Sequence, residues 1–448
     1  MSKKPAASAR VGTGLARVHT ERISAPVVTL PVVTLSPRGV ARIQSGHPWV
    51  YRSDIAAAEN VPSGAMVKVA DQRGKPLGTA LYSSASQIAI RMIGGSHAEV
   101  SDLPALVNER IRAAIAYRRQ FVADTNAFRV VFSEADFLPG LIIDRYNDVL
   151  AVQILTQAMD AEPVRGAVIA TLVEELEPAG IVERVDPRIR ELEQLAPRSS
   201  GLLWGKKSST IITMNAAGTG FPESRESKAE SLSPGIRFHY DALEGQKTGS
   251  FLDQRENYAA AARYAHGAAL DVFCYQGGFA LHLAARGPEA KCSSVTGVDS
   301  SRPALEMAEK NAALNGQLLN GKEIEWIEAN AFDLLRDYAT AGNKYGTVVV
   351  DPPAFAKTKR DLDKARSGYK ELNLRALKML APGGILVTCS CSFHVSGAEF
   401  LEVVAAAAHD AHKSLRLLES RGAAKDHPLL INVPETGYLK CLIFHVSN

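Results

Sequence analysis

Two stretches near the carboxyl end of the sequence carry the side chains best suited to chemistry. Residues 347–351 form an apolar run that ends in Asp351 before two prolines, and residues 384–389 form another that ends in Cys389, with Cys391 two positions later. Apolar, β-branched runs of this length are typical of buried parallel strands. Ligands of an open α/β sheet bind beyond the carboxyl ends of its strands. We therefore expect the acid and the two thiols to face one crevice.

A third stretch, Asp271-Val-Phe-Cys-Tyr-Gln-Gly-Gly278, ends an apolar run and opens a helical one. Its adjacent glycines let a ligand approach the backbone closely. Asp299 ends the next predicted strand, where an acid can accept hydrogen bonds from ribose hydroxyls. The stretch lacks the Gly-x-Gly-x-x-Gly pattern of a dinucleotide site and a Walker-type lysine. A nucleoside cofactor without phosphates, S-adenosylmethionine, fits better, and Asn330-Ala331 follows the third strand where it could contact adenine.

Several of these residues also have purely structural interpretations. Asp299 could cap the helix expected at 302–315, and Cys274 is more often a small buried hydrophobe than a reactive thiol. Cys389 and Cys391 would share one face of a strand and could be metal ligands. No further Cys or His pair at ligand spacing accompanies them, so the sequence predicts no metal site.

The elements that must position these side chains belong to a chain of 448 residues, 46% of them hydrophobic and 22% charged. This length allows two or three domains. No apolar run reaches the roughly 18 residues of a membrane helix, and the first residues lack the apolar core of a secretory signal. We therefore expect a cytoplasmic protein without a membrane partner. The odd number of cysteines, five, without disulfide spacing, indicates reduced thiols.

Positive charge is concentrated at the amino-terminal end. Residues 1–100 carry 12 Lys and Arg against 5 Asp and Glu, although the net charge of the whole chain is only +3. Such a module favours a polyanion partner such as nucleic acid, and a merely solvated basic surface is the alternative. Trp49 lies between Arg42 and Arg52, a grouping that could stack a base and hold phosphate. Trp49 could equally be a core residue.

The pattern of strands and helices divides the chain into four parts. Residues 1–30 are small, polar and unpatterned, as in a disordered extension. Residues 31–100 alternate apolar positions with Gly turns, which predicts a small β-barrel. Residues 101–234 predict a central α+β domain with a loop-rich end at 186–225. Residues 235–448 alternate strands and helices, which predicts an α/β domain with a doubly wound, mostly parallel sheet. Its strands are expected at 269–273, 294–299, 324–328, 347–351, 384–389 and 438–446, and its helices at 279–285, 302–315, 361–380 and 398–412.

The sequence resembles the bacterial RlmI-type methyltransferases of large-subunit ribosomal RNA. The resemblance runs from about Leu35 to the end and includes Gly46-His-Pro-Trp49. Its motifs are Gly245-Gln-Lys-Thr-Gly-Ser-Phe-Leu-Asp-Gln-Arg-Glu-Asn257, Phe273-Cys-Tyr-Gln-Gly-Gly-Phe279, Asp351-Pro-Pro-Ala-Phe355, Thr388-Cys-Ser-Cys-Ser392 and Leu138-Pro-Gly-Leu-Ile-Ile-Asp-Arg145. It implies a PUA domain, a central α/β domain and a class I, Rossmann-like methyltransferase domain. The implied reaction uses S-adenosylmethionine to make 5-methylcytosine in 23S ribosomal RNA.

The resemblance also implies roles for individual residues. Carbon 5 of cytosine becomes nucleophilic only after a thiolate adds to carbon 6, and the base must first be unstacked. Because Thr388-Cys389-Ser390 matches the family's Thr-Cys-Ser, Cys389 is the expected nucleophile, and Asp351 is expected to hydrogen-bond the cytosine edge. Residues expected to bind the cofactor are Phe251, Gln254, Arg255, Asp271, Phe273, Cys274, Tyr275, Gly277, Gly278, Asp299, Asn330, Ala331 and Asp351. Those expected to bind RNA are Arg42, Trp49 and Arg52.

Some alternatives stay open at this point. Many RNA cytosine-5 methyltransferases have a Pro-Cys pair in the Asp351 loop, and here Ala354 follows Pro353, so the base that removes the carbon-5 proton is Cys391, water or Asp351. The Asp-Pro-Pro loop also resembles that of enzymes that methylate amino groups, and a sibling family methylates guanine nitrogen 7. A non-catalytic RNA-binding assembly factor is the third reading. A homodimer is left open as well.

Overall fold

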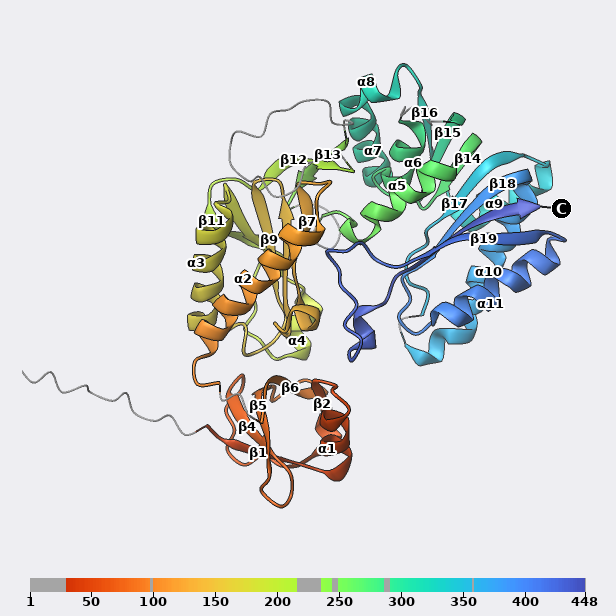
Figure 1. The fold of residues 1–448 in the computed structure, drawn as a ribbon. Helices are drawn as coiled ribbons and strands as arrows, with labels where there is room; N and C mark the ends of the chain where they lie inside the picture. Colours follow the sequence, from red (N-terminus) through yellow and green to blue (C-terminus); the bar gives the residue numbers. More distant parts are fainter. Residues whose placement is uncertain are drawn as a thin grey trace, which may run out of the picture.

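The computed structural model describes residues 30–96, 100–215, 235–243, 249–285, 291–356 and 358–447. Figure 1 shows three bodies in chain order, with the amino-terminal domain at the bottom and the carboxyl-terminal domain at the upper right. The extension expected at 1–30 lies outside the described residues apart from Leu30. Residues 245–248 of the long motif lie outside them too.

The amino-terminal domain is a curled six-stranded sheet with one helix (Figure 1). Its strands follow the order β2-β6-β5-β4-β1-β3, and the β1–β4 pair alone is parallel. The helix begins at Pro37, and the Ser36 side chain caps it by accepting a hydrogen bond from the Gly39 N–H. The predicted barrel is confirmed as a curled sheet, and the helix was not predicted. The elements are β1 (Val32–Leu35), α1 (Pro37–Gln44), β2 (Trp49–Tyr51), β3 (Ile55–Ala57), β4 (Met66–Ala70), β5 (Pro76–Tyr82) and β6 (Ile88–Gly95).

The central domain is a five-stranded sheet in the order β11-β10-β9-β8-β7. Two helices pack side by side, and their apolar residues, such as Ile111 and Leu172, join Ile143 and Val152 of the sheet in one core. Up to residue 215, the expected loop-rich end at 186–225 instead contains a short helix and two strands, and the two strands form because they pair with neighbouring strands. The elements are α2 (Leu103–Phe121), β7 (Ala127–Phe132), β8 (Leu141–Tyr146), β9 (Val149–Ile154), α3 (Glu162–Leu176), β10 (Gly180–Glu183), α4 (Pro187–Leu192) and β11 (Gly201–Gly205).

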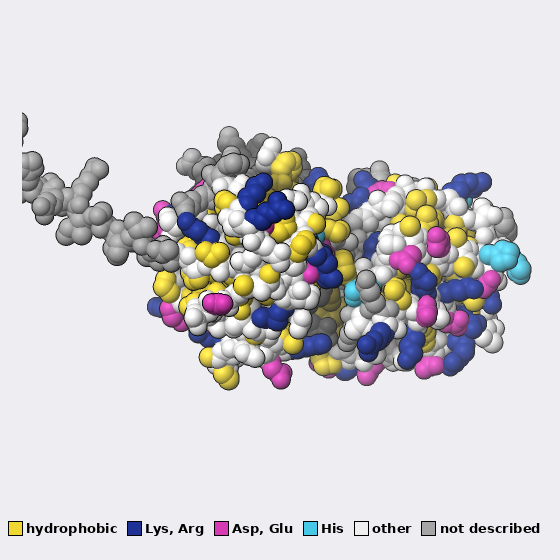
Figure 2. Space-filling view, turned by 90° about the horizontal axis from the view of Figure 1, so that it is seen from below, with side chains coloured by type: hydrophobic (Ala, Val, Ile, Leu, Met, Phe, Trp, Pro, Cys, Tyr) yellow, Lys and Arg dark blue, Asp and Glu magenta, His cyan; other side chains and the backbone are white. Residues whose placement is uncertain are grey.

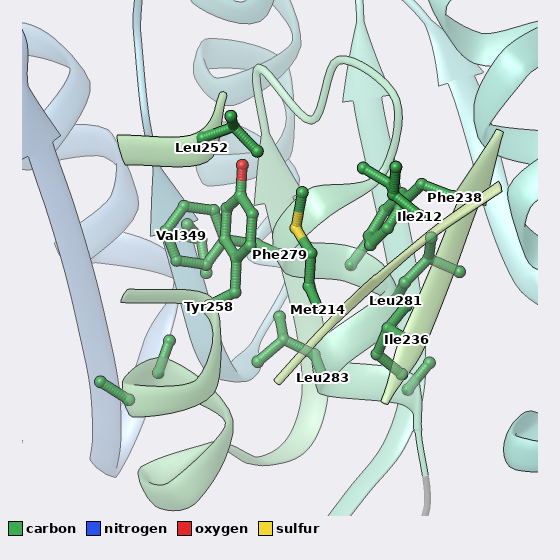
Figure 3. Close-up of a cluster of buried hydrophobic side chains, with 14 of the residues drawn as sticks. Ile212, Met214, Ile236, Phe238, Leu252, Tyr258, Phe279, Leu281, Leu283 and Val349 are labelled. Carbon is green, nitrogen blue, oxygen red and sulfur yellow. The ribbon is translucent and has the colours of Figure 1, made fainter. Parts of the chain in front are cut away.

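A two-stranded antiparallel sheet joins the central and carboxyl-terminal domains. It consists of β12 (Ser209–Met214) and β13 (Ile236–Asp241). On one side Tyr240 stacks on Tyr146 of the central sheet, with ring centroids 3.6 Å apart. On the same face of the sheet, Ile212 and Phe238 lie close to Leu281 of the carboxyl-terminal domain, as Figure 3 shows. The boundary expected between residues 234 and 235 therefore falls between two paired strands.

The carboxyl-terminal domain is a seven-stranded sheet in the order β16-β15-β14-β17-β18-β20-β19. The first five strands are parallel, and β20 runs antiparallel to both of its neighbours, β18 and β19, so the predicted doubly wound, mostly parallel sheet is confirmed. Its strands are β14 (His266–Val272), β15 (Lys291–Asp299), β16 (Ile324–Glu328), β17 (Tyr345–Val350), β18 (Leu380–Ser390), β19 (Ser414–Arg421) and β20 (Lys440–Ser447). Its helices are α5 (Arg255–Tyr264), α6 (Gly278–Ala284), α7 (Arg302–Leu314), α8 (Gly316–Leu319), α9 (Ala331–Ala341), α10 (Leu362–Met379) and α11 (Gly397–Asp410).

Both faces of this sheet are covered by helices, which explains the unbroken apolar runs in its strands. Successive side chains of a strand point to opposite faces. Val349 of β17 thus packs with α5 and α6, whereas Val348 and Val350 pack with α9, α10 and α11. The order of strands changes direction at β14, which lies between β15 and β17. In such sheets the ligand crevice lies beyond the carboxyl ends of the strands at this point.

The connection between β19 and β20 (residues 422–439) leaves the sheet and reaches both other domains. Its buried Asp426 accepts a hydrogen bond from the Arg129 N–H of the central domain at 2.8 Å. Its Asn432 contacts the Gly46 carbonyl of the amino-terminal domain, and its Glu435 lies 3.3 Å from His47. We call this segment the strap. Among the described residues no helix has the length and apolar character needed to cross a membrane.

Candidate active site

The loop between β14 and α6 has a tightly turned backbone. Phe273, Tyr275 and Gly277 have φ values of 67°, 49° and 85°, in the left-handed region that non-glycine residues rarely adopt. The loop is held by hydrogen bonds from the Cys274 N–H to the Val298 carbonyl (3.0 Å) and from the Gly277 N–H to the Cys274 carbonyl. Strained residues of this kind cluster at ligand sites, so the loop predicted to bind the cofactor has suitable geometry.

The two glycines of this loop make room for aromatic rings of the protein itself. A Cβ on Gly278 would lie 2.5 Å from Cζ of Tyr258, and one on Gly277 would lie 2.8 Å from the Trp326 ring. Cys274 is buried, and burial raises the pKa of its thiol far above the ordinary value. The interpretation of Cys274 as a small packed side chain therefore fits better than a reactive thiol.

Three carboxylates lie at the carboxyl ends of β14, β15 and β17. Asp271 is fully buried and accepts a hydrogen bond from the Ala280 N–H at 2.8 Å. Burial, together with the charges of Asp351 and Asp299, raises the pKa of Asp271 to about 8. Its second oxygen is buried without a hydrogen-bond partner among the described residues. A carboxylate-rich edge fits S-adenosylmethionine, because the sulfonium and ammonium groups of that cofactor are cations.

Asp299 bridges two loops rather than capping a helix. Its carboxylate accepts hydrogen bonds from the N–H groups of Tyr275 and Ser301, each at 2.9 Å. Ser301 is the residue that caps α7, through a bond from the Ala304 N–H. A carboxylate has about four lone-pair positions, so Asp299 can still accept ribose hydroxyls.

The adenine end of the predicted site is formed by the start of α9. Asn330 is exposed, and its side-chain oxygen caps α9 by accepting hydrogen bonds from the N–H groups of Phe332 and Asp333. Ala331 is buried, whereas the Phe332 ring is 37% exposed and lies 6.1 Å from the Phe355 ring. Contact of Asn330 and Ala331 with adenine stays a prediction, and Phe332, the next residue of the same motif, adds an apolar surface beside them.

A directed chain of hydrogen bonds orients Asp351. The Arg421 Nε donates to Asn257 Oδ1 (2.8 Å), Asn257 Nδ2 donates to Gln254 Oε1 (2.7 Å), and Gln254 Nε2 donates to Asp351 Oδ2 (2.9 Å). Asn257 Nδ2 also donates to the Gly422 carbonyl, and this bond determines which group is donor and which is acceptor along the series of hydrogen bonds. Gln254 is 3% exposed. Gln254 therefore orients Asp351, and its predicted contact with the cofactor stays a prediction.

Arg255 does not reach the predicted cofactor site. Its side chain is fully buried, and its guanidinium forms ion pairs with Asp124 of the central domain, with Asp426 of the strap and with Glu256. The expected cofactor role is corrected to a structural one between domains, because a buried guanidinium that left its three carboxylates would become an uncompensated buried charge. Phe251 packs edge-on against Tyr275, with centroids 5.0 Å apart, and so borders the cofactor loop.

The structure separates the two thiols that the sequence placed on one face. Cys389 is fully buried within β18 opposite Cys441 of β20, and burial raises the pKa of its thiol well above the ordinary value. The Cys389 sulfur has no exposed surface in this structure, and its role as the nucleophile stays a prediction. Cys391 lies just beyond the end of β18, is half-buried, and its Sγ is 3.9 Å from the Pro352 carbonyl. Within the part of the chain that the structure describes, no group of three or more His, Cys, Asp and Glu residues could hold a metal.

Lys440 is a neighbour of this site that sequence reasoning missed. Lys440 is the first residue of β20, and a charged residue directly before an apolar run was the signal that could have identified it from the sequence. Its Nζ donates hydrogen bonds to the carbonyls of Ser392 (2.7 Å) and Tyr438 (2.8 Å). Burial lowers the pKa of Lys440 to about 8, and interactions with Cys391 and Glu399 act to raise it.

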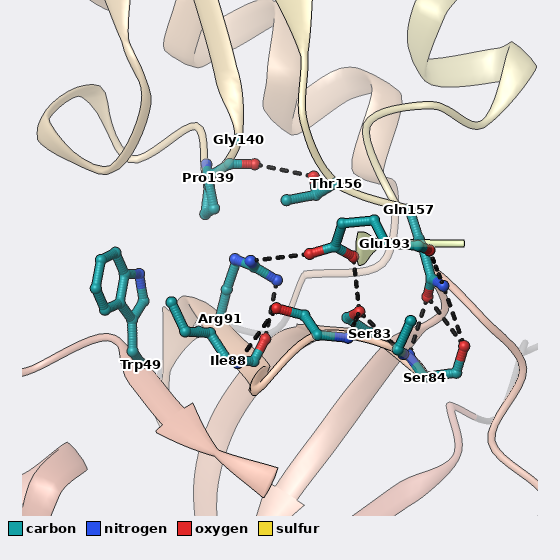
Figure 4. A network of polar contacts seen from close by, with 12 residues as sticks. Trp49, Ser83, Ser84, Ile88, Arg91, Pro139, Gly140, Thr156, Gln157 and Glu193 are labelled. Carbon is teal, nitrogen blue, oxygen red and sulfur yellow. Dashed lines mark hydrogen bonds and ion pairs between the residues drawn. The ribbon is translucent and has the colours of Figure 1, made fainter. Parts of the chain in front are cut away.

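The residues expected to bind RNA make contacts within the protein. Arg52 donates to the carbonyls of Ser83 and Ser86, and Arg42 donates to the Trp49 carbonyl. The Trp49 indole N–H donates to Glu134 of the central domain at 2.9 Å. Figure 4 shows the adjoining junction between the two domains, where Arg91 pairs with Glu193. Trp49 thus contacts the central domain, whereas Arg52 binds carbonyls within its own domain, and RNA binding by these residues stays a prediction.

Comparisons with known proteins agree with this architecture. A family model for a PUA-like domain matches residues 33–94, and one for an S-adenosylmethionine-dependent methyltransferase matches residues 219–445. A relative in Photobacterium profundum named ribosomal RNA large subunit methyltransferase I is 37% identical over 406 residues, which cover 90% of this chain and 96% of the relative. A relative of the same name in Tolumonas auensis is 38% identical over 403 residues, covering 89% and 94%.

Solved structures show the same fold. A Streptococcus mutans protein proposed to be an S-adenosylmethionine-dependent methyltransferase superimposes with a TM-score of 0.74, covering 93% of this chain and all of its own, at 16% identity. Another proposed methyltransferase, solved with S-adenosylhomocysteine, gives a TM-score of 0.73. The predicted resemblance is confirmed, and the cofactor is S-adenosylmethionine. From its motifs, its sheet and these relatives, the chain belongs to the ribosomal RNA large subunit methyltransferase I family.

Proposed function

We propose that the protein methylates carbon 5 of a cytosine in large-subunit (23S) ribosomal RNA, a reaction expected in the cytoplasm. The names of the relatives support the RNA substrate. The observation that carries the cytosine-5 chemistry is the half-buried Cys391 beside the Asp351-Pro352 loop, at the carboxyl edges of β17 and β18. An acid and an accessible thiol at one edge are what addition to a pyrimidine ring requires.

In this mechanism Cys391 takes the role that the sequence assigned to Cys389. S-adenosylmethionine supplies the methyl group. The Cys391 thiolate forms a bond to carbon 6 of an unstacked cytosine, which makes carbon 5 electron-rich enough to accept the methyl group. Asp351, held by Gln254, accepts a hydrogen bond from the amino group of the base and, in its protonated form, donates one to the ring nitrogen, where negative charge develops. After the methyl group is transferred and S-adenosylhomocysteine is left, a base, water or Asp351, takes the carbon-5 proton. The electron pair of that C–H bond re-forms the double bond between carbons 5 and 6, which breaks the sulfur–carbon bond and releases the Cys391 thiolate.

RNA that carries 5-fluorocytosine at the target position tests this proposal. Fluorine cannot leave as the proton does, so the methylated adduct should persist in denaturing electrophoresis. Cys391→Ser should abolish the adduct, because a hydroxyl is a far weaker nucleophile near neutral pH. Cys389→Ala is the matched control and should still form it, since Cys389 is buried. An adduct that depends on Cys389 and not on Cys391 would restore the sequence prediction.

The same experiment separates the other functions. If wild-type protein methylates the RNA but never forms the adduct, the thiol is not a nucleophile. Methylation of guanine nitrogen 7 or of an amino group, which the Asp351-Pro-Pro-Ala-Phe355 loop also resembles, would then replace the proposal. Binding of RNA without any methyl transfer would favour the assembly-factor reading. Nucleoside mass spectrometry of the product distinguishes these cases.

A further inference from the structure

Lys440 is held over the turn that carries Cys391. It is the first residue of β20 and pairs in register with Ser390, the last residue of β18. Its ammonium donates hydrogen bonds to the Ser392 carbonyl at 2.7 Å and the Tyr438 carbonyl at 2.8 Å. The first of these carbonyls belongs to the residue that follows Cys391. The Lys440 ammonium is therefore hydrogen-bonded to the backbone of the turn that contains Cys391.

We propose that Lys440 is a positioning residue that holds Cys391 as a thiolate, ready to attack a pyrimidine ring. The inference rests on the proposed function, in which Cys391 is the nucleophile. The thiolate is the reactive form of cysteine, and a neighbouring lysine favours it. An ammonium has three donors, and the two carbonyls use two of them. The third donor can face the sulfur while the other two hold the ammonium in place.

Electrostatics at the turn agree with this role. Burial lowers the pKa of Lys440 to about 8, so Lys440 is still mainly charged at neutral pH, and the interaction with Cys391 favours that charge. Interaction energies between two groups are mutual, so the charged lysine favours the ionised sulfur to the same degree.

Charged and titratable groups reach the turn from each element packed against it. Glu399 of α11 acts on Lys440 and forms an ion pair with Arg366 of α10. Tyr369 of α10 hydrogen-bonds Ser392 at 2.9 Å, and burial raises the pKa of its hydroxyl, so it stays neutral. Asp351 precedes the Pro352 carbonyl that lies 3.9 Å from Sγ. Lys440 is thus the cation that offsets carboxylates which would otherwise favour the neutral thiol.

Alkylation of Cys391 by iodoacetamide as a function of pH tests the inference in the full-length protein. The other cysteines, Cys274, Cys292, Cys389 and Cys441, are buried, and peptide mass spectrometry follows Cys391 specifically. In the wild type we expect a midpoint below about 8.5, the ordinary value of a free cysteine. Lys440→Met should raise the midpoint by about one pH unit or more and slow alkylation at pH 7 about tenfold. Lys440→Arg should restore most of the wild-type midpoint.

Lys425→Met, an exposed lysine of the strap, is the matched control and should leave the midpoint unchanged. If Lys440→Met does not fold, Lys440→Gln carries the same expectation, because an amide can still donate to the carbonyls without a charge. A midpoint that is the same in wild type and in the uncharged variants overturns the inference. This readout needs neither RNA nor cofactor. A shifted midpoint without any fluorocytosine adduct would therefore refute the proposed function and leave the role of Lys440 intact.

Discussion

Replacing Gln254 with leucine should slow methyl transfer without weakening cofactor binding. Leucine removes the hydrogen bond that Gln254 Nε2 donates to Asp351 at 2.9 Å. A hydrogen bond to a charged group contributes about 1.5–3 kcal/mol. At about 1.4 kcal/mol for each factor of ten, the rate at saturating substrate should fall roughly 10- to 150-fold. Asn257 keeps its hydrogen bond to the Gly422 carbonyl, so the other hydrogen bonds of the series should stay in place.

Gln254→Glu should give a different pH dependence from the leucine variant. Two carboxylates 2.9 Å apart would repel by about 6 kcal/mol at an effective dielectric constant of 20, so the pair retains one proton near neutral pH. The protonated carboxyl group of the variant then replaces the amide as a donor to Asp351. As the pH rises the proton is lost, the carboxylates repel, and activity should fall. The leucine variant should show no such extra loss at high pH.

Tritiated S-adenosylmethionine transfer measures the rate, and calorimetry measures cofactor affinity. Gln317→Leu, in the exposed first turn of α8, is the matched control and should retain full activity. A Gln254→Leu rate within about twofold of wild type, with an unchanged melting temperature, would refute the positioning role. Weak cofactor binding with a normal saturated rate would return Gln254 to the cofactor role that the resemblance implies.

Three further predictions follow from single contacts. Gly278→Ala places a Cβ 2.5 Å from Tyr258 Cζ, so calorimetry should show cofactor affinity reduced about tenfold or more; Gly316→Ala, whose Cβ meets nothing within 4 Å, should bind normally. Asp426→Asn should lower the free energy of unfolding by about 3–5 kcal/mol, because it leaves a buried guanidinium short of a carboxylate. Burial acts to raise the pKa of Asp426, but neighbouring positive charge holds this pKa well below its usual range. Thermal melts should therefore show the full stability difference between wild type and Asp426→Asn above about pH 4, and a smaller difference at lower pH. Cofactor binding near pH 7 should release a proton, because a bound cation favours the ionised form of Asp271, whose pKa is about 8; a binding enthalpy that does not depend on the buffer's ionisation enthalpy would contradict this.

Elements with strong local signals were predicted closely. The strand expected at 324–328 is β16, and the helix expected at 361–380 is α10 (Leu362–Met379). Their apolar period and their flanking turn residues are properties of a few adjacent residues, so no distant contact is needed to define them.

Elements that depend on distant partners were missed. The strands β11, β12 and β19 have polar or mixed sequences, and each forms only against a neighbour. The helix α5 lay within a motif read for its chemistry, and its small residues pack against α6. Burial by another element, rather than local propensity, stabilises such segments.

The predicted RNA contacts show the same limit. Arg42, Trp49 and Arg52 lie close to one another in the sequence, and this grouping suggested a binding surface. In the structure the Trp49 partner is Glu134 of another domain, and Arg52 binds carbonyls about thirty residues away. Such partners are invisible in a single sequence because they are brought together only by tertiary structure, between domains for Trp49 and within the amino-terminal domain for Arg52.

By itself the sequence determined the family, the cofactor and the edge of the sheet at which the chemistry lies. Acids and glycines at the ends of apolar runs were sufficient, because strand ends in a doubly wound sheet converge. Only the tertiary structure distinguished the two thiols. Residues i and i+2 share a face only while the strand continues, and β18 ends at Ser390. Cys389 is therefore enclosed opposite Cys441, whereas Cys391 turns out of the strand beside Lys440 and the Asp351 loop.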